Sequence, residues 1–126
     1  MIPNIENFYE RIANEILHAL PDSWQKAQVN AIFYGDSITW EPEYVTVAGE
    51  LKSLDISMNL IRAFKELRRA FKDAGQPLWG QALFELEPSG KFNMKWGYDN
   101  CDEQGDTIWN EDEWRRRHED RAKRLT

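Results

Sequence analysis

An α+β fold is predicted by two kinds of apolar pattern that alternate along the 126-residue chain. Helical spacing of three and four residues marks two segments, and period-two spacing marks four others. The helical segments are 5–20 and 56–74, and the period-two segments are 25–34, 38–47, 78–87 and 91–98. We therefore expect an antiparallel sheet of four to five strands packed against two amphipathic helices, with a further surface helix at the C-terminal end.

Each of the two helices has one broad apolar face and a residue that ends it. Pro21 ends the first helix, because proline cannot donate the next helical hydrogen bond. Gly75 supplies the left-handed residue that closes the second helix, and Pro77 cannot continue it. Phe64 lies in the middle of the second apolar face, so we expect it in the core. The apolar positions are Ile5, Phe8, Tyr9, Ile12, Ile16, Leu17 and Leu20 in the first helix, and Leu60, Phe64, Leu67 and Phe71 in the second.

The first two strands are joined by Gly35 and Asp36, a pair that favours a tight turn. On the first strand, alternate small and apolar residues from Ala27 to Phe33 share one face. Ile38, Trp40 and Tyr44 share one register of the second strand. Pro42 cannot donate a hydrogen bond to a neighbouring strand, so it predicts an edge, a bulge or a break between residues 41 and 43.

The last two strands form a predicted hairpin around Glu87-Pro88-Ser89-Gly90, a sequence that suits a type I turn with a bulge. The second strand of this hairpin alternates strictly between large apolar and small or charged residues. Trp96 lies in the middle of the apolar register, so we expect it to be core. The apolar register is Phe92, Met94, Trp96 and Tyr98, and the other is Lys91, Asn93, Lys95 and Gly97.

The expected C-terminal helix begins at Asn110, whose side chain can cap it, with Glu113 closing a capping box. Trp109 and Trp114 can pack on one another across this start. The acids at 111–113 precede the arginines at 115–117 by four residues, so local salt bridges account for these charges. The narrow apolar stripe predicts a helix that lies on the domain surface.

Composition excludes several classes of protein. Sixteen basic and twenty-two acidic residues give a net charge of −6, which opposes direct binding of nucleic acid. A single cysteine, Cys101, cannot form an intrachain disulfide or a thiolate metal cluster. The N-terminus lacks a signal peptide pattern, and no run of eighteen apolar residues occurs. We expect one cytoplasmic domain over residues 1–126 with no membrane contact.

The sequence contains no recognisable catalytic or metal-binding pattern. His18 and His118 have no partner at metal-binding spacing, and the sequence DNCDEQGD lacks the spacing of a calcium loop. The scattered glycines form no phosphate-binding motif. The acidic neighbourhood of Cys101 does not lower the pKa of its thiol. The sequence identifies no pocket in which the carboxylates of Glu41 and Glu43 could act as acid and base. We therefore expect no enzyme activity, no metal and no cofactor.

A partner-binding surface is predicted by acids and aromatics that occur together without cations. Residues 96–114 contain seven acids, three tryptophans and no Lys or Arg, and residues 27–51 also lack Lys and Arg. Reversing the four acids between 99 and 106 should slow association without unfolding the protein. The alternative is that the acids are only solvated and that Trp40 and Tyr44 belong to the sheet core. The candidate partner-binding residues are Trp40, Glu41, Glu43, Tyr44, Glu50, Asp99, Asp102, Glu103 and Asp106.

Two segments resemble the YezG-like immunity proteins of bacterial polymorphic toxin systems of the contact-dependent inhibition type. These segments are IENFYERIANEILHALPDSW and LIRAFKELRRAFKDAGQPLWGQALFELEPSGKFNMKWGYDN. The resemblance spans roughly 5–100, is strongest at Leu20-Pro21 and 89–93, and is weaker over 41–57 and after Cys101. It implies a cytoplasmic antidote that binds a cognate toxin domain, often a nuclease, as a monomer in a 1:1 complex.

Two other functions stay open at this point. One is a small enzyme or regulatory domain whose pocket is unreadable from sequence. The other is an RNA-binding adaptor that uses the basic C-terminal helix, although its acids favour a salt-bridged surface helix. The cations of that helix are Arg115, Arg116, Arg117, Arg121, Lys123 and Arg124.

Overall fold

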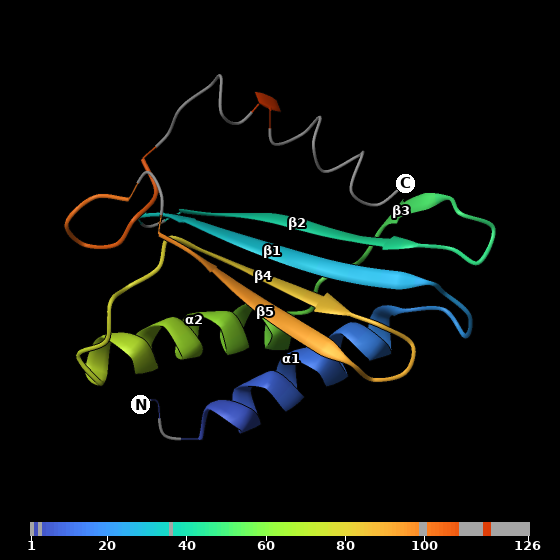
Figure 1. Cartoon of the computed structure of the whole chain (residues 1–126), viewed down its shortest axis with the longest axis horizontal. Coiled ribbons are helices and arrows are strands. Elements are labelled where there is room, and N and C mark those ends of the chain that lie inside the picture. Colours follow the sequence, from blue (N-terminus) through green and yellow to red (C-terminus); the bar gives the residue numbers. More distant parts are fainter. Residues whose placement is uncertain (1, 3, 36, 99–100, 109–114, 117–126) are drawn as a thin grey trace.

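The computed structural model describes residues 2, 4–35, 37–98, 101–108 and 115–116. Five antiparallel strands form one sheet in the order β3-β2-β1-β4-β5, and helices α1 and α2 cover one of its faces (Figure 1). This arrangement confirms the predicted α+β fold, both helices and the pairing within both predicted strand pairs. The elements are α1 (Ile5–Ala19), β1 (Lys26–Tyr34), β2 (Ser37–Val45), β3 (Leu51–Ser53), α2 (Met58–Asp73), β4 (Gln81–Leu86) and β5 (Phe92–Gly97).

The core lies between the two helices and the helix-facing side of the sheet. The predicted face of β1, from Ala27 to Phe33, is buried there, and Phe64 of α2 is completely buried as expected. Trp79, which precedes β4, is also completely buried and contacts three other aromatic rings. Trp96 packs against this core but is only half-buried, because its strand β5 lies at the edge of the sheet.

The end of α2 matches its prediction in detail. Gly75 has a φ of 69°, and its N–H donates to the carbonyl of Lys72. The N–H of Gln76 donates to the carbonyl of Phe71, which completes a Schellman motif. At the other end, the Ser57 hydroxyl accepts a hydrogen bond from the N–H of Leu60 at 3.0 Å. These local bonds fix the length of the helix that forms one wall of the candidate site.

The break expected near Pro42 is wrong, because β2 is continuous from Ser37 to Val45. Pro42 lies opposite Val29 of β1, and its carbonyl accepts a hydrogen bond from the N–H of Leu54 on the other side. The backbone of Pro42 therefore points away from β1, so the missing N–H costs no bond between β1 and β2. β2 lies between β3 and β1, so the edge alternative is wrong as well, and Pro42 lies where the pairing with β3 ends.

The sheet of four to five strands that the sequence predicts has five, but the position of β3 was not predicted, and β2 ends at Val45 rather than at residue 47. A turn follows β2, in which Gly49 has a φ of 87° and donates its N–H to the carbonyl of Thr46. The three residues of β3 are too few to show a period-two pattern. Their pairing with the end of β2 is therefore visible only in the tertiary structure.

The β4–β5 hairpin closes as predicted. The N–H of Gly90 donates to the carbonyl of Glu87, and Gly90 has a φ of 91°, as a type I turn with a bulge requires. The predicted C-terminal helix and Asp99 lie outside the described residues, apart from Arg115 and Arg116, which are helical and exposed. None of the described helices is long and apolar enough to span a bilayer.

Candidate functional site

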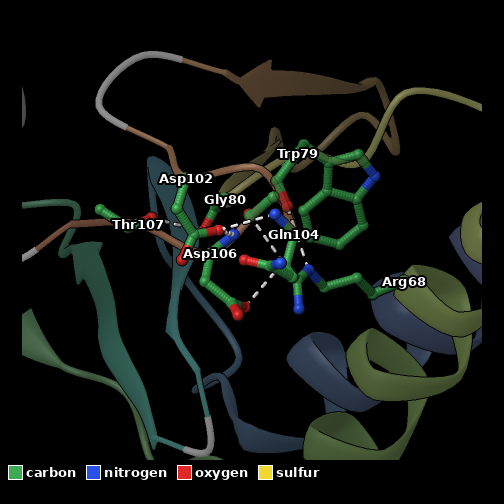
Figure 2. Close-up of polar contacts among 8 residues, drawn as sticks. Arg68, Trp79, Gly80, Asp102, Gln104, Asp106 and Thr107 are labelled. Atoms are coloured by element: carbon green, nitrogen blue, oxygen red, sulfur yellow. Dashed lines mark hydrogen bonds and ion pairs between the residues drawn. The ribbon is translucent and has the colours of Figure 1, made fainter.

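The candidate site is centred on residues 101–107, here called the acidic loop, which lie against the end of the sheet (Figures 1 and 2). Cys101 and Thr107 form an antiparallel bridge across the base of the loop. The N–H of Thr107 donates to the carbonyl of Phe33 at 2.7 Å, and the Thr107 hydroxyl donates to the carbonyl of Gly80 at 3.0 Å. The base of the loop is therefore hydrogen-bonded to both β1 and the residue before β4.

Asp102 closes the turn of the acidic loop. One of its carboxylate oxygens accepts from the N–H of Gln104 at 2.9 Å and from the N–H of Asp106 at 3.0 Å. Its backbone N–H donates to the carbonyl of Asp106, and its carbonyl accepts from the N–H of Gly105. This side chain therefore satisfies the backbone donors of its own loop, as aspartate commonly does in turns.

Arg68 of α2 connects the acidic loop to the rest of the protein (Figure 2). Its Nε donates to the carbonyl of Trp79 at 3.0 Å, and its Nη2 donates to the carbonyl of Gly105 at 2.7 Å. The same nitrogen forms an ion pair with Asp106 at 3.1 Å. The guanidinium also lies 4.6 Å from the ring centre of Phe33, a cation–π geometry. One side chain thus fixes the loop to α2 and to β1.

Two glycines let the acidic loop approach this closely. A Cβ atom at Gly80 would overlap the Cys101 sulfur and the Thr107 hydroxyl, and one at Gly105 would overlap Leu78. Gly105 also has a φ of 82°, which disfavours any other residue. Gly80, Arg68 and Thr107 were not predicted as site residues from the sequence, because their partners are 27 to 38 residues away and no local pattern reports such contacts.

Cys101 lies at the base of the loop and is only partly exposed. Burial raises the pKa of its thiol, and this effect outweighs the opposing influence of hydrogen bonds from Gly80 and Thr107 and of the Arg68 charge. The nearby Asp102 carboxylate raises the thiol pKa further. This direction agrees with the prediction that Cys101 is not an activated nucleophile.

We expect Cys101 to react slowly with iodoacetamide at neutral pH, because a raised pKa leaves less thiolate at any given pH. The half-maximal rate should occur at a higher pH in the folded protein than in the same protein in urea. Alkylation rates measured from pH 6 to 10 in both states test this expectation. A folded-state midpoint at or below the urea value would contradict it.

The candidate residues of β2 divide between the two faces of the sheet. Trp40 and Tyr44 lie on the helix-facing side, half-buried against the core. The centres of the Trp40 and Phe64 rings are 5.5 Å apart. Glu41 and Glu43 lie on the opposite face and are only 2% and 7% exposed. A carboxylate oxygen of Glu41 accepts from the Asn30 amide at 2.9 Å. Glu41 and Glu43 therefore present almost no surface to a partner.

Among the described residues, the exposed candidate acids lie at two separate places rather than in one patch. Glu103 is exposed on the acidic loop and lines a groove together with Gly35 of the turn between β1 and β2, whereas Glu50 follows the opposite end of β2. Nine residues of strand separate these two ends, or roughly 30 Å. The acids of the loop also differ in role, since Asp102 and Asp106 have structural bonds. We therefore expect reversal of Asp102 or Asp106 to disturb the loop, whereas reversal of Glu103 should leave it intact.

Among the described residues, His, Cys, Asp and Glu side chains form no group of three or more that is able to hold a metal ion.

The family described as "Immunity protein YezG-like" matches residues 42–121, a region that includes the segments expected to match less well. The chain is similar to the "Immunity protein YezG" of Bacillus spizizenii (strain ATCC 23059 / NRRL B-14472 / W23), with 22% identity over 118 residues. That similarity covers 78% of this chain and 71% of the relative. The family match extends over more than half of the sequence, and the chain therefore belongs to the YezG-like family of immunity proteins.

Proposed function

We propose that this protein binds a cognate toxin domain in the cytoplasm and neutralises it by contact alone, without catalysis. Its membership of an immunity protein family carries the proposal. The acidic loop supports it, because Arg68, Asp102 and Thr107 fix the backbone of this loop before any partner arrives. A binding surface that is already ordered loses less conformational entropy on association.

A nuclease is the kind of toxin that this surface suits best. Nucleases bind phosphate with Lys and Arg, and exposed carboxylates attract the same cations and steer the encounter. In this proposal, Glu103 and its neighbours in the acidic loop cover the basic active site as one monomer in a 1:1 complex. Glu50, Trp40 and Tyr44 are predicted further contacts, whereas the buried Glu41 and Glu43 act only through their charge.

Reversal of one exposed charge tests the proposal without damage to the loop. We expect Glu103→Lys to slow association with the toxin domain encoded beside this gene by roughly threefold to tenfold at low salt. Glu103 is exposed and, unlike Asp102 and Asp106, is not needed for the bonds that close the loop. The measurement is surface plasmon resonance with a catalytically inactive toxin domain, at low and high salt.

The matched control is Glu87→Lys, which makes the same change of charge at the exposed turn between β4 and β5. This variant should associate with the toxin domain at a rate within about twofold of that of the unchanged protein, since Glu87 lies outside the acidic loop. In a co-expression survival test, Glu103→Lys should protect cells from the toxin less well than the unchanged protein, whereas Glu87→Lys should protect them equally well. Equal rates for both variants would remove the acidic loop from the interface, and the lack of any bound toxin domain would refute the immunity proposal.

A further inference from the structure

Both α1 and α2 lie on one face of the sheet (Figure 1), and the opposite face is polar yet almost fully buried. Gln28 and Asn30 of β1 are 1% and 4% exposed, and their cross-strand partners Glu43 and Glu41 are as deeply buried. Ile32, on the same face, is completely buried although it lies outside the core between the helices and the sheet. A sheet face that is open to water keeps such side chains accessible, so a further layer covers this face.

The buried polar groups of this face require a partner with positive charge and hydrogen-bond donors. Glu41 and Glu43 lie two residues apart on one strand, so both carboxylates are on this face. Burial of a carboxylate is costly unless a cation or several donors lie beside it. The Asn30 amide donates one hydrogen bond to Glu41, and its own carbonyl oxygen has no hydrogen-bond partner among the described residues. Arginine fits these groups, because its guanidinium donates to carboxylate and amide oxygens at once.

A described turn of helix lies on this side of the sheet. Residues 115–116 are helical and exposed, and Figure 1 shows them in red on the side of the sheet opposite α1 and α2. The chain reaches them from Thr107, whose N–H donates to the carbonyl of Phe33 near the end of β1. Eight residues span up to roughly 28 Å, so the connection is long enough for this part of the chain to lie across the face.

The exposure of residues 115–116 sets the orientation of this helix. Successive helical residues are about 100° apart around the axis, so a helix that continues in both directions has Trp114, Arg117 and Arg121 on its opposite side. The two arginines are four positions apart, which is a rise of about 6 Å along a helix. The two buried carboxylates of β2 are two positions apart, which is about 6.6 Å along a strand. The spacing of the arginines therefore matches that of the carboxylates.

We propose that the C-terminal segment, residues 114–125, continues the helix at 115–116 and docks on the polar face of the sheet, with Arg117 and Arg121 paired to the two buried carboxylates of β2. The segment has six cations and two acids, so its charge complements that of the face it covers. Trp114, on the same side of the helix, covers the buried apolar residues of the face. This docking occupies the two arginines within the protein, and it does not depend on the proposed function.

Trypsin, which cleaves after Lys and Arg where the chain is loose, is the probe for the docking. We expect Glu41→Gln, Glu43→Gln to speed cleavage within residues 115–124 at least about tenfold, because removal of both charges releases the segment. The control Glu6→Gln, Glu10→Gln makes the same change of charge at exposed positions of α1 and should leave this rate within about twofold. Mass spectrometry assigns each cleavage. Cleavage within α2 should be equal in both variants and in the unchanged protein, which excludes general unfolding.

The reciprocal variant changes the cations instead of the carboxylates. Arg117→Glu, Arg121→Glu should speed solvent exchange of the Asn30 side-chain amide at least about tenfold, since the docked segment covers that amide. The control Arg116→Glu, Lys123→Glu makes the same change of net charge on the opposite side of the helix and should leave this exchange within about twofold. Two-dimensional NMR of the whole chain measures the amide directly.

Equal cleavage in the carboxylate variant and its control, or equal exchange in the two cation variants, would overturn the proposal. A second copy of the chain is the alternative cover for this face. It predicts that exchange of the Asn30 side-chain amide slows as the protein concentration rises from about 10 to about 500 µM. We expect no such dependence, and its observation would also overturn the proposal. Thermal melts of all four variants confirm that each one is folded.

Discussion

Replacing Phe64 with alanine is expected to lower the free energy of unfolding by about 3–5 kcal/mol. The Phe64 side chain, in the middle of α2, is fully buried, and the centre of its ring lies 5.5 Å from the centre of the Trp40 ring. The substitution removes apolar burial and leaves a cavity between the helix and the sheet. A loss of this size is a large part of the total stability of a domain of this length.

Urea denaturation followed by circular dichroism measures this loss, with Trp96→Ala as a comparison. The Trp96 ring contacts Phe71 and Trp79 but is only half-buried, so its truncation should cost less than that of Phe64. Leu17→Ala is the control, because Leu17 is 44% exposed on α1. A Phe64→Ala variant within about 1 kcal/mol of the control would show that the α2 register is wrong.

Replacing Arg68 with methionine is expected to cost about 2–3 kcal/mol, since it removes hydrogen bonds of a charged donor that is largely buried. The carbonyls of Trp79 and Gly105 lose their donor, and Asp106 loses its ion pair. Methionine has a long apolar stem that keeps part of the packing on Phe33. The predicted loss therefore reports mainly on the guanidinium and less on the volume of the side chain.

Two measurements separate a local effect at the acidic loop from general destabilisation. Urea denaturation gives the change in free energy of unfolding, and native-state hydrogen exchange gives the protection of the Thr107 amide, which bonds to Phe33. In Arg68→Met, the protection of Thr107 should fall while the amides of α1 are unchanged. The control Arg62→Met, at an exposed position of α2, should alter neither measurement. Equal stability of the two variants would contradict the assigned role of Arg68.

The Arg68→Met variant, which should loosen the acidic loop, also tests the proposed function. If the carboxylates of this loop contact the toxin, Arg68→Met should weaken binding although Arg68 itself lies beneath the loop. Glu103→Lys should weaken binding with the fold intact. The two variants together distinguish the positioning of the loop from its charge.

The sequence by itself determined the elements whose signals are local. The apolar stripes of α1 and α2, the left-handed Gly75 and the turn around Gly90 each depend on residues a few positions apart, where propensity and spacing act directly. The same holds for the alternation of β1, whose buried face from Ala27 to Phe33 agrees with prediction. The family resemblance likewise came from contiguous segments, and the family match confirmed it.

Only the tertiary structure decided which residues reach solvent and which meet across long sequence separations. Pro42 fits a continuous strand because its partner Leu54 lies twelve residues on, after a turn that no local pattern revealed. Arg68 is a structural cation because the acidic loop returns to it from 37 residues away. Glu41 is buried and Glu103 is exposed although both carry the same charge. Charge and residue type are properties of the chain, whereas exposure and partnership follow from how distant segments pack, which a one-dimensional pattern does not specify.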